Sequence, residues 1–254
     1  MKQTDITNLN NKGFTILKNW VDKKTLNDVR KILPKNFAIH KKIRIKNNNG
    51  IVSDQIAMNV LASDDFFINF LQKMIERGLI KDLEEHYFKN SCILNSFSAL
   101  SNIPSESSLF YKKFHRDIKI YSHSAPVFLN MLVMVDDFTV ENGGTLLLPF
   151  SHLKEAAPTK EFWKKNSVSM TGSAGDIVLW NGNIFHASGI NKTLQDRRGL
   201  PITFTLPYYK QLLDYPRALG YDRMSDFSLK MQDILGYNSR VPSSVEEWYR
   251  PMSK

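Results

Sequence analysis

Three residues of this 254-residue chain have the types and spacing of a metal-binding site. His115 and Asp117 form a His-x-Asp pair, and His186 lies further along the chain. Side chains alternate faces along a strand, so residues two apart point the same way and can reach one cation. Two histidines and one carboxylate on one face of an iron ion leave three positions open for a bidentate co-substrate and O2. A His-x-Asp pair alone is a weak signal, so its context decides.

The segments around the pair supply that context. FHRD occupies 114–117, an Asn-Gly turn leads to Pro-x-Ser-His at 149–152, and His-x-Ser-x-x-Asn occupies 186–191. Arg197 follows eleven residues after the second histidine. With these four elements the chain resembles the phytanoyl-CoA dioxygenase family, a branch of the Fe(II)- and 2-oxoglutarate-dependent oxygenases. The resemblance covers residues 90–210.

The resemblance implies roles for five residues. His115, Asp117 and His186 would hold Fe(II), leaving positions for 2-oxoglutarate and O2. Arg197 would bind the distal carboxylate of 2-oxoglutarate, with the Ser188 hydroxyl beside it. The chemistry agrees, because a planar guanidinium meets a carboxylate through two parallel hydrogen bonds.

Three further residues are candidates for the substrate or co-substrate pocket. Asn95 lies on a strand expected before the metal-binding segment, Arg116 lies between the two ligands, and His123 lies six residues beyond Asp117. Each also has a plain structural interpretation, as a turn, strand or surface residue. His152 is expected to be structural, because the family does not use this histidine as a ligand.

Two residues in or beside the motifs, Arg198 and Phe150, bear on how the site is assigned. Arg198 adjoins Arg197 and should leave the opposite face of a strand, so we assign the co-substrate contact to Arg197. The family's usual Pro-Gly-Ser-His is Pro-Phe-Ser-His here, with Phe150 in place of the glycine. Because of that change the conformation of the local loop is not predicted, whereas the predicted metal site is unaffected.

The hydrophobic pattern places helices before residue 90 and strands after it. Residues 25–33 and 63–88 have apolar residues at helical spacing. Pro34 should end the first helix, and Gly78 should divide the second. Residues 41–50 (KKIRIKNNNG) are expected to form an exposed loop or edge strand. Strands are expected at 13–18, 92–100, 126–135, 145–150, 172–180, 184–188 and 201–209, with hairpin turns at 141–144 and at Asn181-Gly182.

These elements predict a mainly β fold with flanking helices. The strands most simply form a double-stranded β-helix (a cupin-like jelly roll) with an N-terminal helical layer packed on it. We expect a single oxygenase domain across residues 1–254, with the β core at 90–210 and an irregular or helical C-terminal extension.

The composition limits which cellular compartment and which binding partners we expect. The chain has one cysteine, no apolar leader and no apolar stretch near the ~20 residues of a membrane helix, so we expect a cytoplasmic protein without a membrane partner. A net charge of +9 fits the general solubility of a Lys- and Asn-rich chain, and it tilts the expected small-molecule substrate slightly toward an anionic one. Nucleic acid is not expected, because AlkB-like repair oxygenases place two separated arginines further beyond the distal histidine, whereas Arg197 and Arg198 are adjacent.

The sequence therefore predicts a dioxygenase that uses Fe(II), 2-oxoglutarate and O2. We expect it to hydroxylate an unactivated C–H bond of a small molecule with release of succinate and CO2, while desaturation and ring closure stay open. Related halogenases lack the metal-binding carboxylate that Asp117 supplies here, so chlorination is not expected. The alternative is a metal-binding, cupin-like sensor without turnover, against which Arg197 and Ser188 argue.

Overall fold

Two antiparallel sheets form the centre of the protein in a computed structural model, from which we describe all residues except 50–54, 105–112, 123–124 and 250–254. The larger sheet has the strand order β1-β8-β5-β10-β4-β2, and β3 also pairs with β10. The smaller sheet has the order β7-β6-β9. The strands are β1 (Phe14–Leu17), β2 (Ile56–Ala57), β3 (Ile93–Phe97), β4 (Ala99–Asn102), β5 (Phe128–Met134), β6 (Leu146–Leu147), β7 (Val168–Ser169), β8 (Ile177–Asn181), β9 (His186–Ala187) and β10 (Arg197–Thr205).

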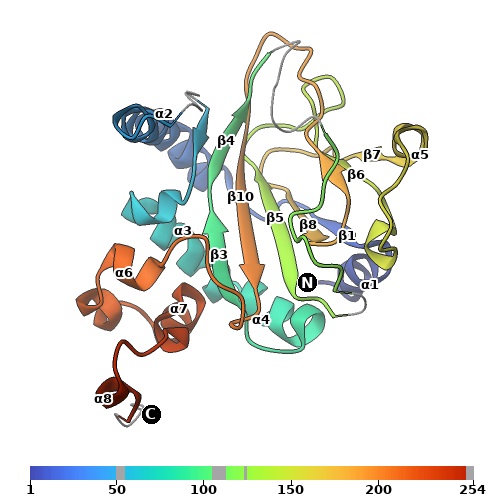
Figure 1. Cartoon of the computed structure of the whole chain (residues 1–254). Helices are drawn as coiled ribbons and strands as arrows, with labels where there is room; N and C mark the ends of the chain where they lie inside the picture. The colour runs from blue at the N-terminus through green and yellow to red at the C-terminus, as the bar shows by residue number, and fades with distance from the viewer. Residues whose placement is uncertain (50–54, 105–112, 123–124, 250–254) are drawn as a thin grey trace.

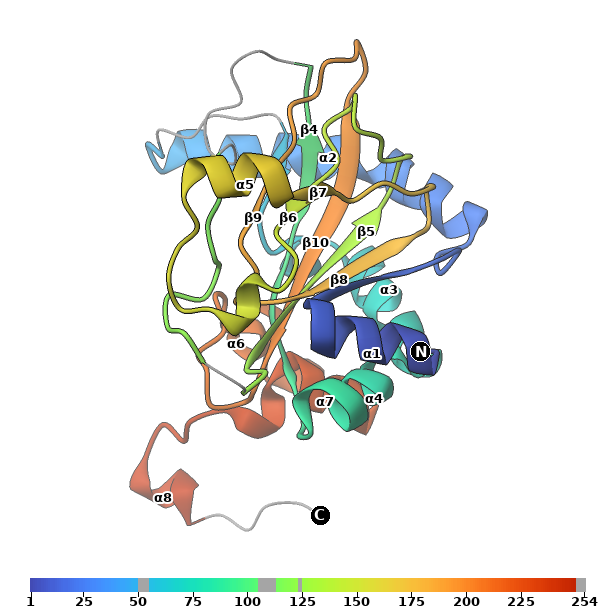
Figure 2. The ribbon, with the colours of Figure 1, turned by 90° about the vertical axis from the view of Figure 1, so that its right-hand side faces the viewer.

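Helices cover one face of the larger sheet, and the smaller sheet faces the other (Figures 1 and 2). Alternate residues of β5 divide between two apolar clusters, as the period of a strand requires. Leu129, Met131 and Val133 pack in the cluster shared with the helices. Leu132 and Met134 pack in a second cluster with Leu147 of the smaller sheet, so their face is the interior between the sheets.

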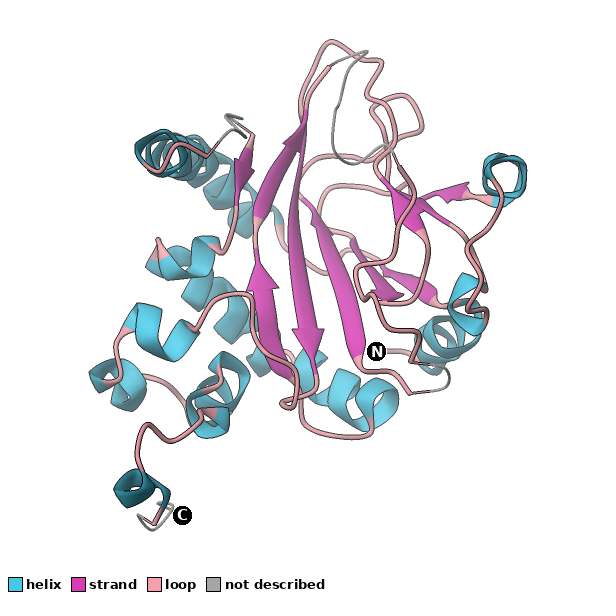
Figure 3. Cartoon of the chain, viewed as in Figure 1, coloured by secondary structure: helices cyan, strands magenta, loops and turns pink. Residues whose placement is uncertain are grey.

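The fold is mainly antiparallel sheet with flanking helices, as expected, although the helices Gln3–Lys12 and Lys160–Asn166 were not predicted (Figure 3). Gly78 divides the second predicted helix, with a left-handed φ of 76° that suits glycine. Within the described residues no helix is both long and apolar enough to cross a membrane. The helices are α1 (Gln3–Lys12), α2 (Lys23–Lys46), α3 (Asp65–Glu76), α4 (Leu79–Leu83), α5 (Lys160–Asn166), α6 (Tyr215–Leu219), α7 (Leu229–Leu235) and α8 (Val245–Trp248), and a π-helical turn (Glu84–Phe88) follows α4.

Two predictions about α2 were wrong. The helix continues through Pro34 and on to Lys46, so most of 41–50 is neither loop nor strand. A proline inside a helix costs about 3 kcal/mol, because it removes one hydrogen bond and crowds the preceding turn. Here the apolar spacing carries on across the proline, and both Leu33 and Phe37 are buried against the core. Burial of apolar side chains before and after Pro34 offsets the free-energy cost of the proline. A rule that considers only neighbouring residues does not include this burial.

The predicted hairpin at Asn181-Gly182 was also wrong. The strand before it, β8, pairs with β1 and β5, whereas the strand after it, β9, pairs with β6 of the other sheet. The turn therefore carries the chain from one sheet to the other. Neither Asn181 nor Gly182 has the positive φ that a two-residue hairpin of this type needs. Gly182 is required for a different reason, since a Cβ there would lie 2.7 Å from the Phe128 Cβ.

Candidate active site

Three side chains converge where the segment around residue 115 meets β9. His115 and His186 exchange two backbone hydrogen bonds, of 3.0 and 2.9 Å, which fixes them side by side. Asp117 reaches both rings, with Oδ1 3.4 Å from His115 Nε2 and Oδ2 3.4 Å from His186 Nε2. One ligand atom from each residue lies within 4.8 Å of the others. This arrangement can hold a metal ion with two histidines and one carboxylate.

Both histidines are held in the tautomer that a metal requires. His115 Nδ1 lies 3.0 Å from the Lys113 carbonyl, and His186 Nδ1 lies 3.0 Å from the Ile184 carbonyl. A carbonyl only accepts, so each Nδ1 carries the proton, and each Nε2 keeps a free lone pair facing Asp117. Such a bond to the far nitrogen is how proteins orient a metal-binding imidazole.

The three groups shift one another's pKa values. Burial acts to raise the pKa of Asp117, but the charge of His186 and the hydrogen bond that the protonated form of His115 donates outweigh it, and the pKa is lowered. The hydrogen bond with Asp117 raises the pKa of His115, whereas burial lowers that of His186. The carboxylate is therefore ionised at neutral pH, and His115 is the first ligand to take up a proton on acidification.

Metal affinity should fall at acid pH, and His115 should set where the decline begins. A protonated imidazole cannot bind a metal ion, so below the raised pKa of His115 each pH unit should lower the apparent affinity about tenfold. Above that pKa the affinity should not change through this group. Titration of the protein with Mn(II) at a series of pH values measures the profile. A flat profile down to about pH 5 would contradict a histidine-bound metal.

Arg197 lies at the start of β10 with its side chain enclosed. It is 2% exposed, and its guanidinium lies 4.0 Å from the centre of the Phe138 ring. Nη2 donates to the Gly143 carbonyl at 3.1 Å, but Nε and Nη1 have no hydrogen-bond partner among the described residues. Burial lowers the pKa of Arg197 to about 10, so it stays charged at neutral pH. A buried cation with unused donors fits a bound carboxylate such as that of 2-oxoglutarate.

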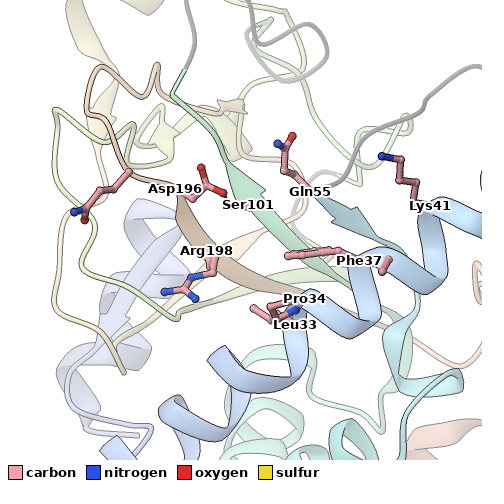
Figure 4. A pocket seen from close by; sticks show the side chains of 10 residues that line it. Leu33, Pro34, Phe37, Lys41, Gln55, Ser101, Asp196 and Arg198 are labelled. Atoms are coloured by element: carbon pink, nitrogen blue, oxygen red, sulfur yellow. Dashed lines mark hydrogen bonds between the residues drawn. The ribbon is translucent and has the colours of Figure 1, made fainter.

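Arg198 leaves the opposite face of β10, as the alternation of a strand requires. Its guanidinium makes two bonds to Asp136, of 2.8 and 2.7 Å. It also lines a hollow of about 660 Å³ beside α2, whose apolar side includes Leu33 and Phe37 (Figure 4). No metal-site residue lines this hollow, so its position separates Arg198 from the triad.

Most of the chain matches one family of known proteins. Residues 9–199 match the model of the phytanoyl-CoA dioxygenase (PhyH) family. The chain belongs to this family. Membership implies Fe(II), 2-oxoglutarate and O2 as cofactor and co-substrates, and the two histidines, the carboxylate and the incompletely paired guanidinium fit that set. The protein is therefore a dioxygenase of the non-haem iron, 2-oxoglutarate type.

Curated relatives and solved structures are similar to most of this chain. An uncharacterized protein of Mycobacterium tuberculosis is 30% identical over 196 residues, which are 75% of this chain and 70% of that protein. Dioxygenase trt7 of Aspergillus terreus is 33% identical over 184 residues, 66% of this chain and 59% of trt7. AviO1 from Streptomyces viridochromogenes superposes with a TM-score of 0.60 at 18% identity, covering 82% of this chain and 96% of AviO1.

A second solved structure, the non-haem α-ketoglutarate-dependent epimerase SnoN, superposes with a TM-score of 0.58 at 15% identity. The match covers 81% of this chain and 83% of SnoN. These likenesses confirm the predicted cupin-like jelly roll.

The other predicted site residues of this PhyH protein have varied surroundings. Ser188 is half-buried directly after β9, and its hydroxyl donates to the Gly189 carbonyl at 3.3 Å. Asn95 is buried and donates to the Lys210 carbonyl at 3.1 Å, so its amide links β3 to the segment after β10. Arg116 donates to three carbonyls of the 151–155 segment and to the carbonyl of Asn183, and its guanidinium packs on the Phe185 ring. His123 lies outside the described residues.

Two buried polar residues near the triad were not predicted as site residues. Asn130 and Trp180 face each other across β5 and β8, and each is 5% exposed. The Trp180 ring meets the His186 ring edge-on at 5.4 Å, and the Asn130 amide acts on Asp117. An asparagine interrupting the apolar run 126–135 was the signal that could have identified Asn130.

The loop at the altered Pro-Phe-Ser-His motif keeps the glycine conformation. Phe150 has a left-handed φ of 61° and is half exposed. Ser151, next to it, accepts the Phe185 N–H through its hydroxyl at 2.9 Å. The turn therefore has the backbone that a glycine would give, at a cost of about 1–2 kcal/mol for the side chain.

Proposed function

We propose that this PhyH-family protein hydroxylates an unactivated C–H bond of a small molecule and converts 2-oxoglutarate to succinate and CO2. The observation that carries the proposal is the buried, incompletely paired Arg197. A cation without a full set of acceptors is costly in a protein interior, so its retention calls for a ligand that completes the set. The distal carboxylate of 2-oxoglutarate is such a ligand.

We assign the residues the following roles. His115, Asp117 and His186 would hold Fe(II), which would supply C–H oxidation with O2 when bound. Arg197 holds the distal carboxylate, and the Ser188 hydroxyl supports it. The protein's contribution is orientation, charge and exclusion of water from the site.

The substrate is proposed to be anionic. Lys113 and Lys119 flank the metal-binding pair at two-residue spacing, and both are exposed. The charge of Lys119 acts to lower the pKa of His115, which places that ammonium group near the metal site. Exposed ammonium groups this close in sequence to the site would draw in a negatively charged substrate.

Turnover is tested by succinate release from a panel of carboxylate and phosphate compounds and their neutral analogues, with Fe(II), 2-oxoglutarate and ascorbate. We expect substrate-dependent succinate from anionic compounds and a product heavier by one oxygen atom. No chlorinated product is expected in chloride buffer, because Asp117 fills the position that chloride would take. Succinate release with an unchanged substrate mass would replace hydroxylation by another outcome, such as the epimerisation described for SnoN.

The second candidate is a metal-binding sensor without turnover. Such a protein has no evident need for a buried guanidinium with two unused donor nitrogens. Succinate release distinguishes the two functions. A sensor that binds 2-oxoglutarate would leave it intact in the presence of O2 and every compound of the panel.

A further inference from the structure

A row of four polar side chains crosses the interior face of the larger sheet beside the metal site. The residues are register partners on neighbouring strands: Trp180 of β8 pairs with Asn130 of β5, Asn130 with Thr203 of β10, and Thr203 with Ser96 of β3. Each is 9% exposed or less. The rest of this face is largely apolar, so a polar row here calls for an explanation.

The hydrogen bonds along the row have a fixed direction. Ser96 Oγ donates to Thr203 Oγ1 at 3.2 Å, and Thr203 Oγ1 donates to Asn130 Oδ1 at 3.4 Å. An amide oxygen only accepts, so the single Thr203 proton goes to Asn130, and Ser96 supplies the bond that Thr203 accepts. The chain thereby holds the Asn130 oxygen toward Thr203 and turns its NH2 group away from that strand.

The Asn130 NH2 group, turned away from Thr203, lies on the side of its other register partner Trp180, whose ring meets the His186 ring edge-on at 5.4 Å. Nδ2 is buried and has no well-formed hydrogen bond to any described residue. It nonetheless lies close enough to Asp117 to help lower the pKa of that carboxyl. An amide donor held beside a carboxylate can bond the oxygen that the metal does not use.

We propose that Asn130 is a positioning residue for Asp117. Its amide, oriented by Thr203 and Ser96, donates to one carboxylate oxygen and leaves the other for the metal. This inference rests on the proposed function, in which Asp117 is an iron ligand. Groups that hold a metal ligand in this way typically contribute 10- to 100-fold in metal affinity.

The test is Co(II) binding, measured by affinity and by the d–d absorption spectrum, alongside the melting temperature. Asn130→Leu should weaken Co(II) binding about 10- to 100-fold and change the spectrum, because Asp117 is no longer held to one oxygen. Thr203→Val, which frees the Asn130 amide to turn, should shift both readouts in the same direction by less.

Thr205→Val is the matched control. Thr205 lies on the same strand, is fully buried, and donates its hydroxyl to the Val127 carbonyl at 2.9 Å, outside the row. It should lower the melting temperature as Thr203→Val does and leave Co(II) affinity and spectrum unchanged. Normal Co(II) binding by a folded Asn130→Leu protein, or equal effects of the two threonine variants, would overturn the inference alone. Failure of the wild-type protein to bind Co(II) would overturn the proposed function with it.

Discussion

His186→Ala is expected to abolish detectable Fe(II) binding and turnover while leaving a folded protein. Four-ligand zinc sites bind with about 10–16 kcal/mol, or about 3 kcal/mol a ligand. Losing one of only three protein ligands should therefore weaken metal binding by more than about 100-fold. His115→Ala and Asp117→Ala should act likewise. Isothermal titration with Fe(II) under anaerobic conditions measures the effect.

His152→Ala is the control for loss of a buried imidazole. His152 is 5% exposed and His186 is 8% exposed, so both substitutions remove a ring from the interior. The Nε2 of His152 lies 3.3 Å from the Asn10 carbonyl, away from the triad. Both variants should lose stability, but only His186→Ala should lose iron. Normal iron affinity in His186→Ala would remove that residue from the metal site.

The grouping of His115, Asp117 and His186, which the structure brings together, was predictable because its signals are local in sequence. His115 and Asp117 are two residues apart, and Arg197 follows His186 at a fixed spacing within one motif. Asn130 was not predicted as a site residue, because the role that we propose for it depends on the register that brings β5 opposite β8 and β10. Single-sequence patterns give the existence of a strand but not which residue faces which across a sheet.

The wrong predictions about the fold have the same origin. Pro34 ends a helix by local rules, but burial on both sides of it keeps α2 intact. Asn181-Gly182 has the composition of a hairpin, but its two strands find partners in different sheets. In both places a tertiary contact outweighs a local preference, and the printed sequence does not show that contact.

Arg197→Met should weaken 2-oxoglutarate binding by roughly 30-fold to several-thousand-fold with iron affinity nearly unchanged. Truncating one partner of a buried charge pair typically costs ~2–5 kcal/mol, and each ~1.4 kcal/mol is tenfold in affinity. The measurement is a titration of 2-oxoglutarate into Fe(II)-loaded, oxygen-free protein, followed by the metal-to-ligand absorption band. Methionine keeps most of the side-chain volume, so the pocket should not collapse.

Arg198→Met separates a specific contact from general positive charge. It removes the same charge one residue away, but from a side chain bonded to Asp136 on the other face of β10. We expect 2-oxoglutarate affinity within a few-fold of wild type and a modest loss of stability. Equal effects of the two substitutions would contradict the assignment to Arg197, and a larger effect of Arg198→Met would move it by one residue.

The stability of the ligand-free protein gives an independent check on Arg197. A charge without full pairing in the interior destabilises the fold, so replacing it with an apolar side chain of similar volume should leave the melting temperature unchanged or raise it. Arg198→Met should lower it, because Asp136 loses its paired bond. Adding 2-oxoglutarate to the iron-loaded protein should raise the melting temperature of wild type and Arg198→Met, but not of Arg197→Met. A residue whose removal stabilises the empty protein and abolishes the gain from ligand is retained for binding and not for folding.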